Sequence, residues 1–411
     1  MDIIIGAGVT GLSYAMFCKN DYLILEGTDS IGGYCKTTKR NGFVWDYSGH
    51  FFHFRHKEIE EMVTSAINKN ELVLVDKCTK ISYKDKLVDF PFQKNIHQLE
   101  KDEFIDCLYD LFVNETMCSS NFKEMLYEKF GRSIAEKFLI PYNEKLYACD
   151  LNRLDKDAMG RFFPYAEKED IIRNFKRADN GSYNGQFVYP KGGAIEYIHS
   201  IATHVDPNKI RLNCKVSRID TIAHEVIIES GEHIHYDRLI STMPFVQLLN
   251  CCDLPYDAGT YSWNKVLVFN LGFDKQGKDV ETHWIYFPED KYCFYRVGFY
   301  SNILRSDRMS LYVELGFSAL ETIDVNTYKQ RVLEDLKKAG ILEEGMQLVD
   351  SEAIIMNPAY VHISKKSEED LKTQSQLLEE KDIYSIGRYG GWCYCSIEDN
   401  ILQAKDLTER L

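Results

Sequence analysis

The chain has 411 residues, of which 45% are hydrophobic and 13% aromatic, so it can form one large or two medium domains and is not intrinsically disordered. Its formal net charge is −14 and its Lys and Arg residues never cluster into a block, which argues against a nucleic-acid-binding protein. No apolar run approaches the length needed to cross a bilayer.

The twelve cysteines are scattered along the chain, and no C-x-x-C pair occurs. The nearest pairs are Cys251 with Cys252 and Cys393 with Cys395. This spacing supports neither a zinc ribbon nor a thioredoxin-type motif. The chain opens directly on "MDIIIGAG" without a signal peptide, so the sequence predicts a cytoplasmic protein with free thiols.

A dinucleotide-binding motif opens the chain. "DIIIGAGVTGLSYAMF" predicts a short buried strand, a turn through Gly6, Gly8 and Gly11, and a helix. In this G-x-G-x-x-G pattern the glycines permit the turn, the approach of a pyrophosphate to the backbone, and close packing of helix on strand. A second strand, "YLILEG", ends in Glu26, where recognition of a ribose requires an acid. The motif therefore predicts binding of NAD or FAD, without choosing between them.

The stretch after Glu26 favours FAD. It holds a glycine pair, Gly32 and Gly33, and then a hairpin signal at Asn41 and Gly42. In a nicotinamide dehydrogenase, strand and helix would keep alternating instead. The observed order resembles the N-terminus of FAD proteins of the amine oxidase and UDP-galactopyranose mutase superfamily.

Three histidines at three-residue spacing, His50, His53 and His56, follow in "DYSGHFFHFRH". They could converge on a metal ion only from a helix, and Gly49 with the aromatic run disfavours a helix here. We therefore predict no metal site. Aromatic packing and one wall of a pocket for a flat ligand are the remaining interpretations.

The rest of the chain alternates between helical and strand-rich stretches. Residues 56–68 and 97–178 show helical periodicity, which indicates a helical insertion. From "GQFVYPKGGAIEYIHSIATHV" onward, a strand, a helix and short strands indicate a return to the nucleotide domain. "WNKVLVFNLGF", "HWIYFPED", "CFYRVGFYSN" and "MSLYVELGF" predict an antiparallel sheet. "IYSIGRYGG" predicts a last strand, before a helix that begins near Ser396.

The predicted fold class is α/β: a Rossmann-like FAD-binding domain with a helical insertion and an antiparallel-sheet substrate domain. We expect these domains to be interleaved. The FAD-binding domain is expected in three parts, 1–90, 181–245 and 376–411, the last comprising the C-terminal strand and helix. The helical insertion on the uridine side is expected at 91–180 and the antiparallel-sheet domain at 246–375.

Over nearly its whole length the chain resembles UDP-galactopyranose mutases, particularly eukaryotic-type members, and their flavin oxidase relatives. The blocks that carry the resemblance occur in family order: "GAGVTGL", "NGFVWDYSGHFFHF", "PFQKNI", "PYNEKLYA", "FVYPKGG", "LISTMP", "WIYFPED", "FYRVGFYSN" and "GRYGGWCY". "PFQKNI", "YFPED" and "FYRVGFYSN" are closer to the mutases. "GRYGGWCYCSIEDN" is more like the oxidase-type relatives.

The resemblance implies an isomerase, an intramolecular transferase that interconverts the pyranose and furanose forms of a UDP-galactose-like sugar. In that family reduced FAD is the active form, and its N5 is the nucleophile at the anomeric carbon. NADH or NADPH is a candidate reductant. The implied role is supply of galactofuranose for polysaccharide biosynthesis, with a nucleotide sugar as partner, no nucleic acid and no membrane span. A monomer and a homodimer both stay open.

The resemblance also implies substrate-binding residues. Arg161 and Arg296 match the family's two diphosphate-binding, catalytic arginines, and arginine suits this task because its forked donors make charge-assisted hydrogen bonds. Tyr286, Tyr360 and Tyr394 match its phosphate-binding tyrosines. Further substrate-binding candidates, several on the uridine side, are Gln93, Asn143, Tyr147 and Asn184. The family usually has Trp at position 147.

On the flavin side, the resemblance implies a longer set of cofactor-binding residues: Gly6, Gly8, Thr10, Gly11, Glu26, Gly33, Gly49, Val216, Gly387, Arg388, Asp399 and Asn400. The helix that begins at Ser396 would point its amides toward the pyrimidine edge of the flavin and stabilise negative charge there. His50 would be the catalytic side chain nearest to flavin N5, beside a Gly49 that lets the backbone approach the ring. His53 would be a second wall residue, and His56 would only open the next helix.

Two alternatives remain. The chain could be an FAD-dependent oxidase or dehydrogenase of the amine oxidase superfamily, or a non-catalytic binding protein like the GDP-dissociation inhibitors (GDI) that share this fold. The arginine and tyrosine set argues against the first alternative, because an apolar or amine substrate has no use for two arginines. The intact "GAGVTGL" with Glu26 argues against the second.

Overall fold

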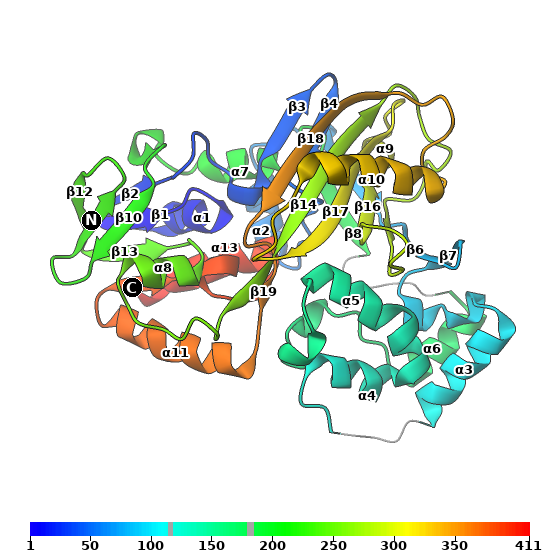
Figure 1. The fold of residues 1–411 in the computed structure, drawn as a ribbon. Helices are drawn as coiled ribbons and strands as arrows, with labels where there is room; N and C mark the ends of the chain where they lie inside the picture. The colour runs from blue at the N-terminus through cyan, green and yellow to red at the C-terminus, as the bar shows by residue number, and fades with distance from the viewer. Residues whose placement is uncertain (114–117, 179–184) are drawn as a thin grey trace.

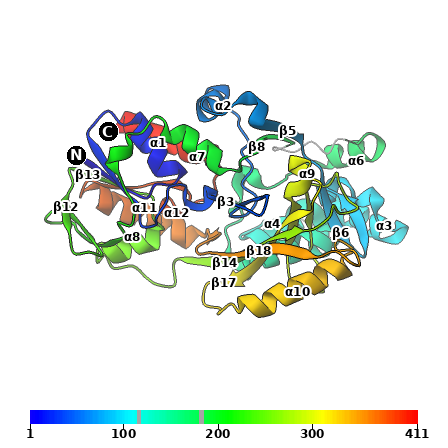
Figure 2. The ribbon, with the colours of Figure 1, turned by 90° about the horizontal axis from the view of Figure 1, so that it is seen from above.

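The computed structural model describes residues 1–113, 118–178 and 185–411. Figure 1 shows two halves side by side: a parallel sheet whose half carries both chain termini, and a large sheet with a helical lobe beneath it. Seen from above in Figure 2, the helical lobe again lies on the side of the large sheet, away from the termini.

The parallel sheet is covered on both faces. Its first strand, β1 (Asp2–Ile5), is buried throughout. Ile4 faces a core that includes α1 (Val9–Phe17), whereas Ile3 and Ile5 face a second core, which explains the unbroken apolar run in the sequence. The strand order is β20 (Ile383–Ser385), β13 (Arg238–Ser241), β1, β2 (Tyr22–Leu25) and β9 (Ile210–Arg211).

The helices of this half divide between the two faces. Residues of α1, α7 (Ile195–Ala202) and α13 (Ile397–Arg410) pack with Ile4. Residues of α8 (Phe245–Cys251) and α11 (Lys365–Glu379) pack with Ile3 and Ile5. One short helix, α12 (Gly387–Gly390), follows β20. A separate three-stranded sheet consists of β10 (Val216–Asp220), β11 (Glu225–Ile228) and β12 (His233–His235).

The large sheet is antiparallel apart from one parallel pair, β15 with β6. Its strand order is β18 (Leu348–Met356), β14 (Ser262–Phe273), β17 (Ser310–Ser318), β16 (Arg296–Phe299), β15 (Trp284–Tyr286), β6 (Thr79–Tyr83) and β7 (Lys86–Asp89). Alternate residues of β14 face opposite cores: Leu267 packs in the core with α10 (Val325–Lys338), and Val266 packs with Phe43 and Trp45. The short β19 (Val361–His362) pairs with the start of β14, and α9 (Tyr300–Leu304) follows β16.

Phe43 and Trp45 belong to the hairpin of β3 (Thr37–Arg40) and β4 (Phe43–Asp46), which turns at Asn41 and Gly42 as predicted. A second antiparallel pair, β5 (Leu72–Asp76) with β8 (Gln186–Pro190), lies beside the large sheet. The helical lobe contains α3 (Lys101–Phe112), α4 (Phe122–Ile134), α5 (Ile140–Tyr147) and α6 (Lys168–Lys176). The remaining helix, α2 (Lys57–Thr64), packs against α7.

The observed elements differ from the predicted domain organisation in three respects. β6 and β7 fall within 1–90, yet they extend the large antiparallel sheet because β6 pairs with β15. Helix α11 crosses the boundary at 375, and β18 completes the large sheet in a stretch where no strand was predicted. Each difference arises from pairing or packing between segments far apart in the chain. Within the described ranges, no helix combines the length and the apolarity that a membrane span requires.

Candidate flavin and nucleotide site

A cavity of about 1420 Å³ lies between the carboxyl ends of the parallel strands and the large sheet, with part of the helical lobe as a third wall. In open α/β sheets ligands bind at this end of the strands. The wall residues come from both ends of the chain and from its middle, including Gly6, Glu26, Asn143, Arg296 and Asn400.

At the nucleotide end, the Glu26 carboxylate is hydrogen-bonded to the backbone of the glycine turn. One of its carboxylate oxygens accepts from the backbone N–H of Ala7 at 2.8 Å, and the other from the N–H of Thr28 at 2.9 Å. A side chain on Gly11 would place its Cβ 2.0 Å from the Gly6 carbonyl oxygen, so only glycine allows helix and strand to pack this closely. The carboxylate is thus held at the cavity wall, where a ribose hydroxyl could reach it.

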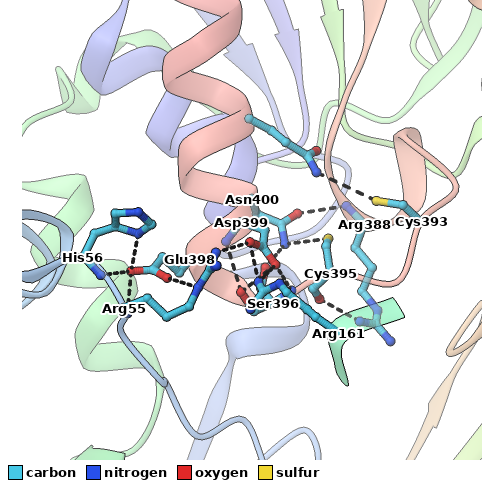
Figure 3. Close-up of polar contacts among 11 residues, drawn as sticks. Arg55, His56, Arg161, Arg388, Cys393, Cys395, Ser396, Glu398, Asp399 and Asn400 are labelled. Carbon is cyan, nitrogen blue, oxygen red and sulfur yellow. Dashed lines mark hydrogen bonds and ion pairs between the residues drawn. The ribbon is translucent and has the colours of Figure 1, made fainter. Parts of the chain in front are cut away.

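Asn400 joins three segments in the cavity wall (Figure 3). Its Oδ1 accepts from the Thr10 hydroxyl at 2.8 Å and from the Arg388 N–H at 2.8 Å. Helix α13 begins with a capping box, in which Asp399 N–H donates to the Ser396 hydroxyl and Ser396 N–H donates to the Asp399 carboxylate. The positive end of the helix dipole therefore faces the cavity, because Ser396 and Ile397 line it.

Two acidic residues of α13 interact with basic residues beside the cavity (Figure 3). The buried Glu398 accepts from the backbone N–H groups of Arg55 and His56 at 2.9 and 2.8 Å. Asp399 pairs with the Arg161 guanidinium at 2.6 Å. Arg161 therefore lines the cavity with its charge already partly neutralised.

On the large sheet, Tyr286, Arg296 and Glu314 form a row across β15, β16 and β17. Arg296 donates from Nε and Nη2 to the two oxygens of Glu314, both at 2.7 Å. Burial alone would raise the pKa of Glu314, but Arg296 and the hydroxyl of Ser48 keep the pKa below its usual value. Glu314 is therefore ionised and forms a buried, bidentate ion pair with Arg296.

Arg388 has a different environment. Its guanidinium lies 4.6 Å from the ring centre of Tyr394 and 5.4 Å from that of Tyr360, and its Nη1 donates to the Cys395 carbonyl at 2.9 Å. Within the described part of the chain, no carboxylate lies within ion-pair distance of it. Arg388 is thus a cavity arginine without a compensating acid.

The three histidines have different environments. His50 lines the cavity, its Nδ1 is buried without a well-formed hydrogen bond among the described residues, and burial lowers its pKa to about 4. His53 also lines the cavity, where its Nδ1 lies 3.0 Å from the Gln186 carbonyl oxygen. His56 is the N-cap of α2, as predicted. The described residues hold no group of three potential ligands arranged for a metal ion.

Gly49 lines the cavity, but the structure gives a further reason for glycine there. A Cβ at this position would lie 2.6 Å from the Tyr312 hydroxyl and 2.8 Å from the Phe51 ring. The close approach that requires glycine is therefore made by the protein's own aromatic side chains, whether or not a ring lies on the other side.

Most of the predicted site residues meet at this cavity. Those that line it are His50, Arg161, Arg296, Asn143, Tyr286, Tyr360, Tyr394, Gly6, Gly8, Thr10, Glu26, Gly33, Gly49, Val216, Arg388 and Asn400. Asp399, Gly11 and Gly387 do not line the cavity, but each contacts a residue that does. Asn184 lies outside the described residues.

The geometry does not support two predicted substrate contacts. Gln93 is buried away from the cavity and donates from its amide to the Pro164 carbonyl. Tyr147 is buried behind the wall, with its ring against Tyr360 at 5.9 Å and His362 at 6.1 Å. Both positions were matched by local sequence alone, which does not show which way a side chain faces.

Sequence reasoning missed several wall residues. Lys77 and Trp284 line the cavity, and the Lys77 ammonium lies 5.8 Å from the Trp284 ring centre. Burial lowers the pKa of Lys77 to about 8. Glu314, the partner of Arg296, was also missed. No local motif marks these residues, because their partners are distant in the chain.

Comparison with known proteins identifies the family. The family profile described as "Flavin containing amine oxidoreductase" matches residues 19–351. This chain belongs to that family. A reduced UDP-galactopyranose mutase has the same fold with a TM-score of 0.93 at 25% identity, over 100% of this chain and 93% of that one. The coproporphyrinogen III oxidase of Staphylococcus aureus is 26% identical over 326 residues, 68% of either chain.

Cyclohexylamine oxidase from Brevibacterium oxydans shares the fold, with a TM-score of 0.71 at 14% identity over 100% of this chain and 98% of that one. The chain is therefore a UDP-galactopyranose mutase-like member of the FAD-dependent amine oxidase superfamily, and the predicted superfamily and α/β fold class are confirmed. Closeness to eukaryotic-type mutases stays a prediction.

Family membership implies FAD as the cofactor, and the residues fit it. The glycine turn and Glu26 would hold the adenosine diphosphate half, at the end of β1 and β2. The start of α13 and Asn400 would face the ring, with His50 beside it. Asn143 also lines the cavity, and its Oδ1 is buried without a donor among the described residues.

Proposed function

We propose that this flavoprotein is a nucleotide-sugar mutase that interconverts the pyranose and furanose forms of a UDP-galactose-like sugar. The observation that carries the proposal is the presence of Arg161, Arg296 and Arg388 in the same cavity as the flavin-binding residues. Guanidinium groups hold a diphosphate through paired, charge-assisted hydrogen bonds. An amine substrate would be repelled by this set.

Each of the three arginines would have a different role in binding the diphosphate. Arg388, which the resemblance places among the flavin-binding residues, has no compensating acid, so it would also supply net positive charge that attracts the diphosphate. Arg296 is held by Glu314 through Nε and Nη2, which leaves Nη1 to orient a phosphate oxygen. Arg161 would exchange Asp399 for phosphate when substrate binds.

Reduced FAD, when bound, would supply the nucleophile for the anomeric carbon. The residues of the chain would hold the diphosphate before and after its bond to the sugar breaks. The hydroxyls of Tyr360 and Tyr394 lie on the same wall and would donate to the phosphates. The amides at the start of α13 would favour negative charge at the ring edge.

The role that follows is supply of furanose sugars for polysaccharide biosynthesis in the cytoplasm, with NADH or NADPH as reductant. The binding residues come from one chain, so a monomer would suffice, and a homodimer is equally compatible.

A second function has its own support. The 26% identity with a coproporphyrinogen III oxidase extends over 326 residues, so an FAD-dependent oxidase acting on a larger reduced substrate is the alternative. A carboxylate-bearing substrate would also have use for cavity arginines.

One assay separates the two. The FAD-loaded protein is incubated with UDP-galactofuranose, with and without dithionite, and UDP-galactopyranose is measured by chromatography. The mutase proposal expects conversion only with reductant and no oxygen consumption. Oxygen-dependent oxidation of coproporphyrinogen III without sugar conversion would establish the oxidase instead, and a protein that cannot be reconstituted with FAD would contradict both.

A further inference from the structure

Two cysteines lie together in the loop between α12 and α13, beside the cavity (Figure 3). Amides from successive turns of α13 hold both sulfurs: Asn400 Nδ2 donates to Cys395 Sγ at 3.3 Å, and Gln403 Nε2 to Cys393 Sγ at 3.8 Å. Both sulfurs are thus anchored by the same helix, on one loop and two residues apart in the sequence.

The pair is also reachable. Cys393 is half-buried and lines a second hollow of about 400 Å³, on the outer side of the same loop. Cys395 is buried and lines both this hollow and the main cavity. A small molecule could therefore reach Cys393 first, with Cys395 behind it.

The surroundings favour a thiolate at Cys393. The hydrogen bond from the Cys395 thiol, aided by Gln403 and the charge of Arg388, outweighs burial and lowers the pKa of Cys393 to about 7. The adjacent pair Cys251 and Cys252 shows the opposite behaviour, because burial raises both pKa values, that of Cys252 to about 12. The two pairs of neighbouring cysteines are therefore not equivalent in this protein.

We propose that Cys393 and Cys395 form a redox-active dithiol that reacts with small-molecule disulfides. The Cys393 thiolate attacks one sulfur of the disulfide, its S–S bond breaks, and the first thiolate leaves. The Cys395 thiol then passes its proton to solvent and attacks the Cys393 sulfur, and the second thiolate leaves. The protein dithiol is oxidised to one disulfide, and the small disulfide is reduced to two thiols.

The disulfide would act on the cavity through the residue between the two cysteines. Tyr394 stacks on Tyr360 with ring centres 5.9 Å apart, and the Cys395 carbonyl accepts from Arg388. Closing the S–S bond constrains this loop, so oxidation would change the position of Tyr394 and of Arg388. This inference concerns thiol chemistry and does not depend on which reaction the flavin performs.

Peptide mapping tests the proposal directly. The tryptic peptide 389–405 contains Cys393 and Cys395 and no other cysteine, and the peptide 239–265 contains only the control pair Cys251 and Cys252. FAD-loaded protein is treated with oxidised glutathione at pH 8, alkylated, digested and analysed by mass spectrometry. We expect peptide 389–405 to lose both alkylation sites and the mass of two hydrogens at least roughly ten-fold faster than the control peptide.

Dithiothreitol should restore both alkylation sites. Cys395→Ser should stop the reaction at a mixed disulfide on Cys393, and Cys393→Ser should leave Cys395 in its reduced form. A wild-type peptide 389–405 that stays doubly alkylated, or that carries one glutathione on each cysteine, would overturn the proposal. This mapping needs no variant, so the test stands even where a substitution prevents folding.

Discussion

At the scale of single residues, the site depends on how each charge is compensated. Arg296 and Arg161 are both paired, whereas Arg388 faces aromatic rings and a carbonyl. The same amino acid therefore has two roles in one cavity: a preorganised donor and a source of net charge. The compensation depends on partners in other strands and helices, which local sequence does not show.

His50 gives the first prediction. Because its pKa is about 4, the imidazole is neutral at physiological pH and can act only as a neutral hydrogen-bonding group. His50→Ala should lower turnover about ten-fold or more and leave FAD bound, as measured by steady-state kinetics and the flavin spectrum. His199→Ala, on the outer part of α7, is the control. Unchanged turnover in His50→Ala would refute the assignment.

The Arg296–Glu314 pair gives the second prediction. Glu314→Gln leaves a buried arginine without its carboxylate, so the free energy of unfolding in urea should fall by about 3–5 kcal/mol. The exposed pair Arg211–Glu232 has a similar bidentate geometry, and Glu232→Gln should lower that free energy much less, because solvent screens the exposed charges. Equal losses for the two variants would show that burial of the pair does not matter.

At the scale of elements, helix starts and strand ends build the cavity. The capping box at Ser396 positions α13, and a second capping box at Ser364 starts α11 outside the cavity. The two helices thus share the same capping box, but only α13 begins at the cavity. Comparing variants of the two caps therefore separates an effect on helix stability from an effect on flavin binding.

We predict that Ser396→Ala and Ser364→Ala both lower the free energy of unfolding by about 1 kcal/mol, because each removes an N-cap acceptor. Only Ser396→Ala should also weaken FAD binding, by roughly five-fold if the same 1 kcal/mol is lost from the bound state. Flavin fluorescence titration measures this. Equal FAD affinities in the two variants would separate α13 from the flavin site.

Asp46 joins three elements and gives a pH prediction. Its buried carboxylate accepts from Thr37 of β3, Tyr189 of β8 and the backbone of Ala194 before α7. Burial raises its pKa to about 6, although these three hydrogen bonds lower it. Between pH 4 and 6 the folded state therefore holds a proton that the unfolded state has lost, so this carboxyl group reduces stability as pH rises.

The difference in the free energy of unfolding between wild type and Asp46→Asn should accordingly fall by about 2–3 kcal/mol from pH 4 to pH 7. Urea unfolding at both pH values measures it. Comparing the two proteins at each pH removes the contribution of the other titrating groups. A difference that is independent of pH would mean that Asp46 titrates normally.

At the scale of the whole molecule, the cavity wall joins both ends of the chain. Strand β20, near the C-terminus, lies in the same sheet as β1. Asn400 is hydrogen-bonded to Thr10, which lies 390 positions earlier in the sequence. Because FAD would contact both ends, its binding should stabilise the entire nucleotide half. This explains how an FAD domain assembled from separate segments can form one site.

The melting temperature should therefore rise by several degrees when FAD is present at about 100 times its dissociation constant, which corresponds to about 3 kcal/mol. Riboflavin, which lacks the adenosine diphosphate held by the glycine turn and Glu26, should give a much smaller rise. Differential scanning fluorimetry compares the two ligands. An equal shift with riboflavin would show that the glycine turn does not bind the cofactor.

The sequence by itself determined the features that depend on neighbouring residues. The glycine turn with Glu26, the hairpin at Asn41 and Gly42 and the helix start at Ser396 all lie where predicted. Each is set by short-range geometry: backbone conformations that glycine permits, a strand length, and a cap that bonds its own helix. From such features the family and the flavin-binding half could be inferred.

Only the tertiary structure decided which side chains share the cavity and how their charges are balanced. The row of Tyr286, Arg296 and Glu314 depends on strand register, and a shift of one residue would turn these side chains away. Gln93 and Tyr147 face the interior although the sequence blocks that contain them resemble the family. Register and packing are set by contacts between distant segments, so no short stretch of sequence contains them.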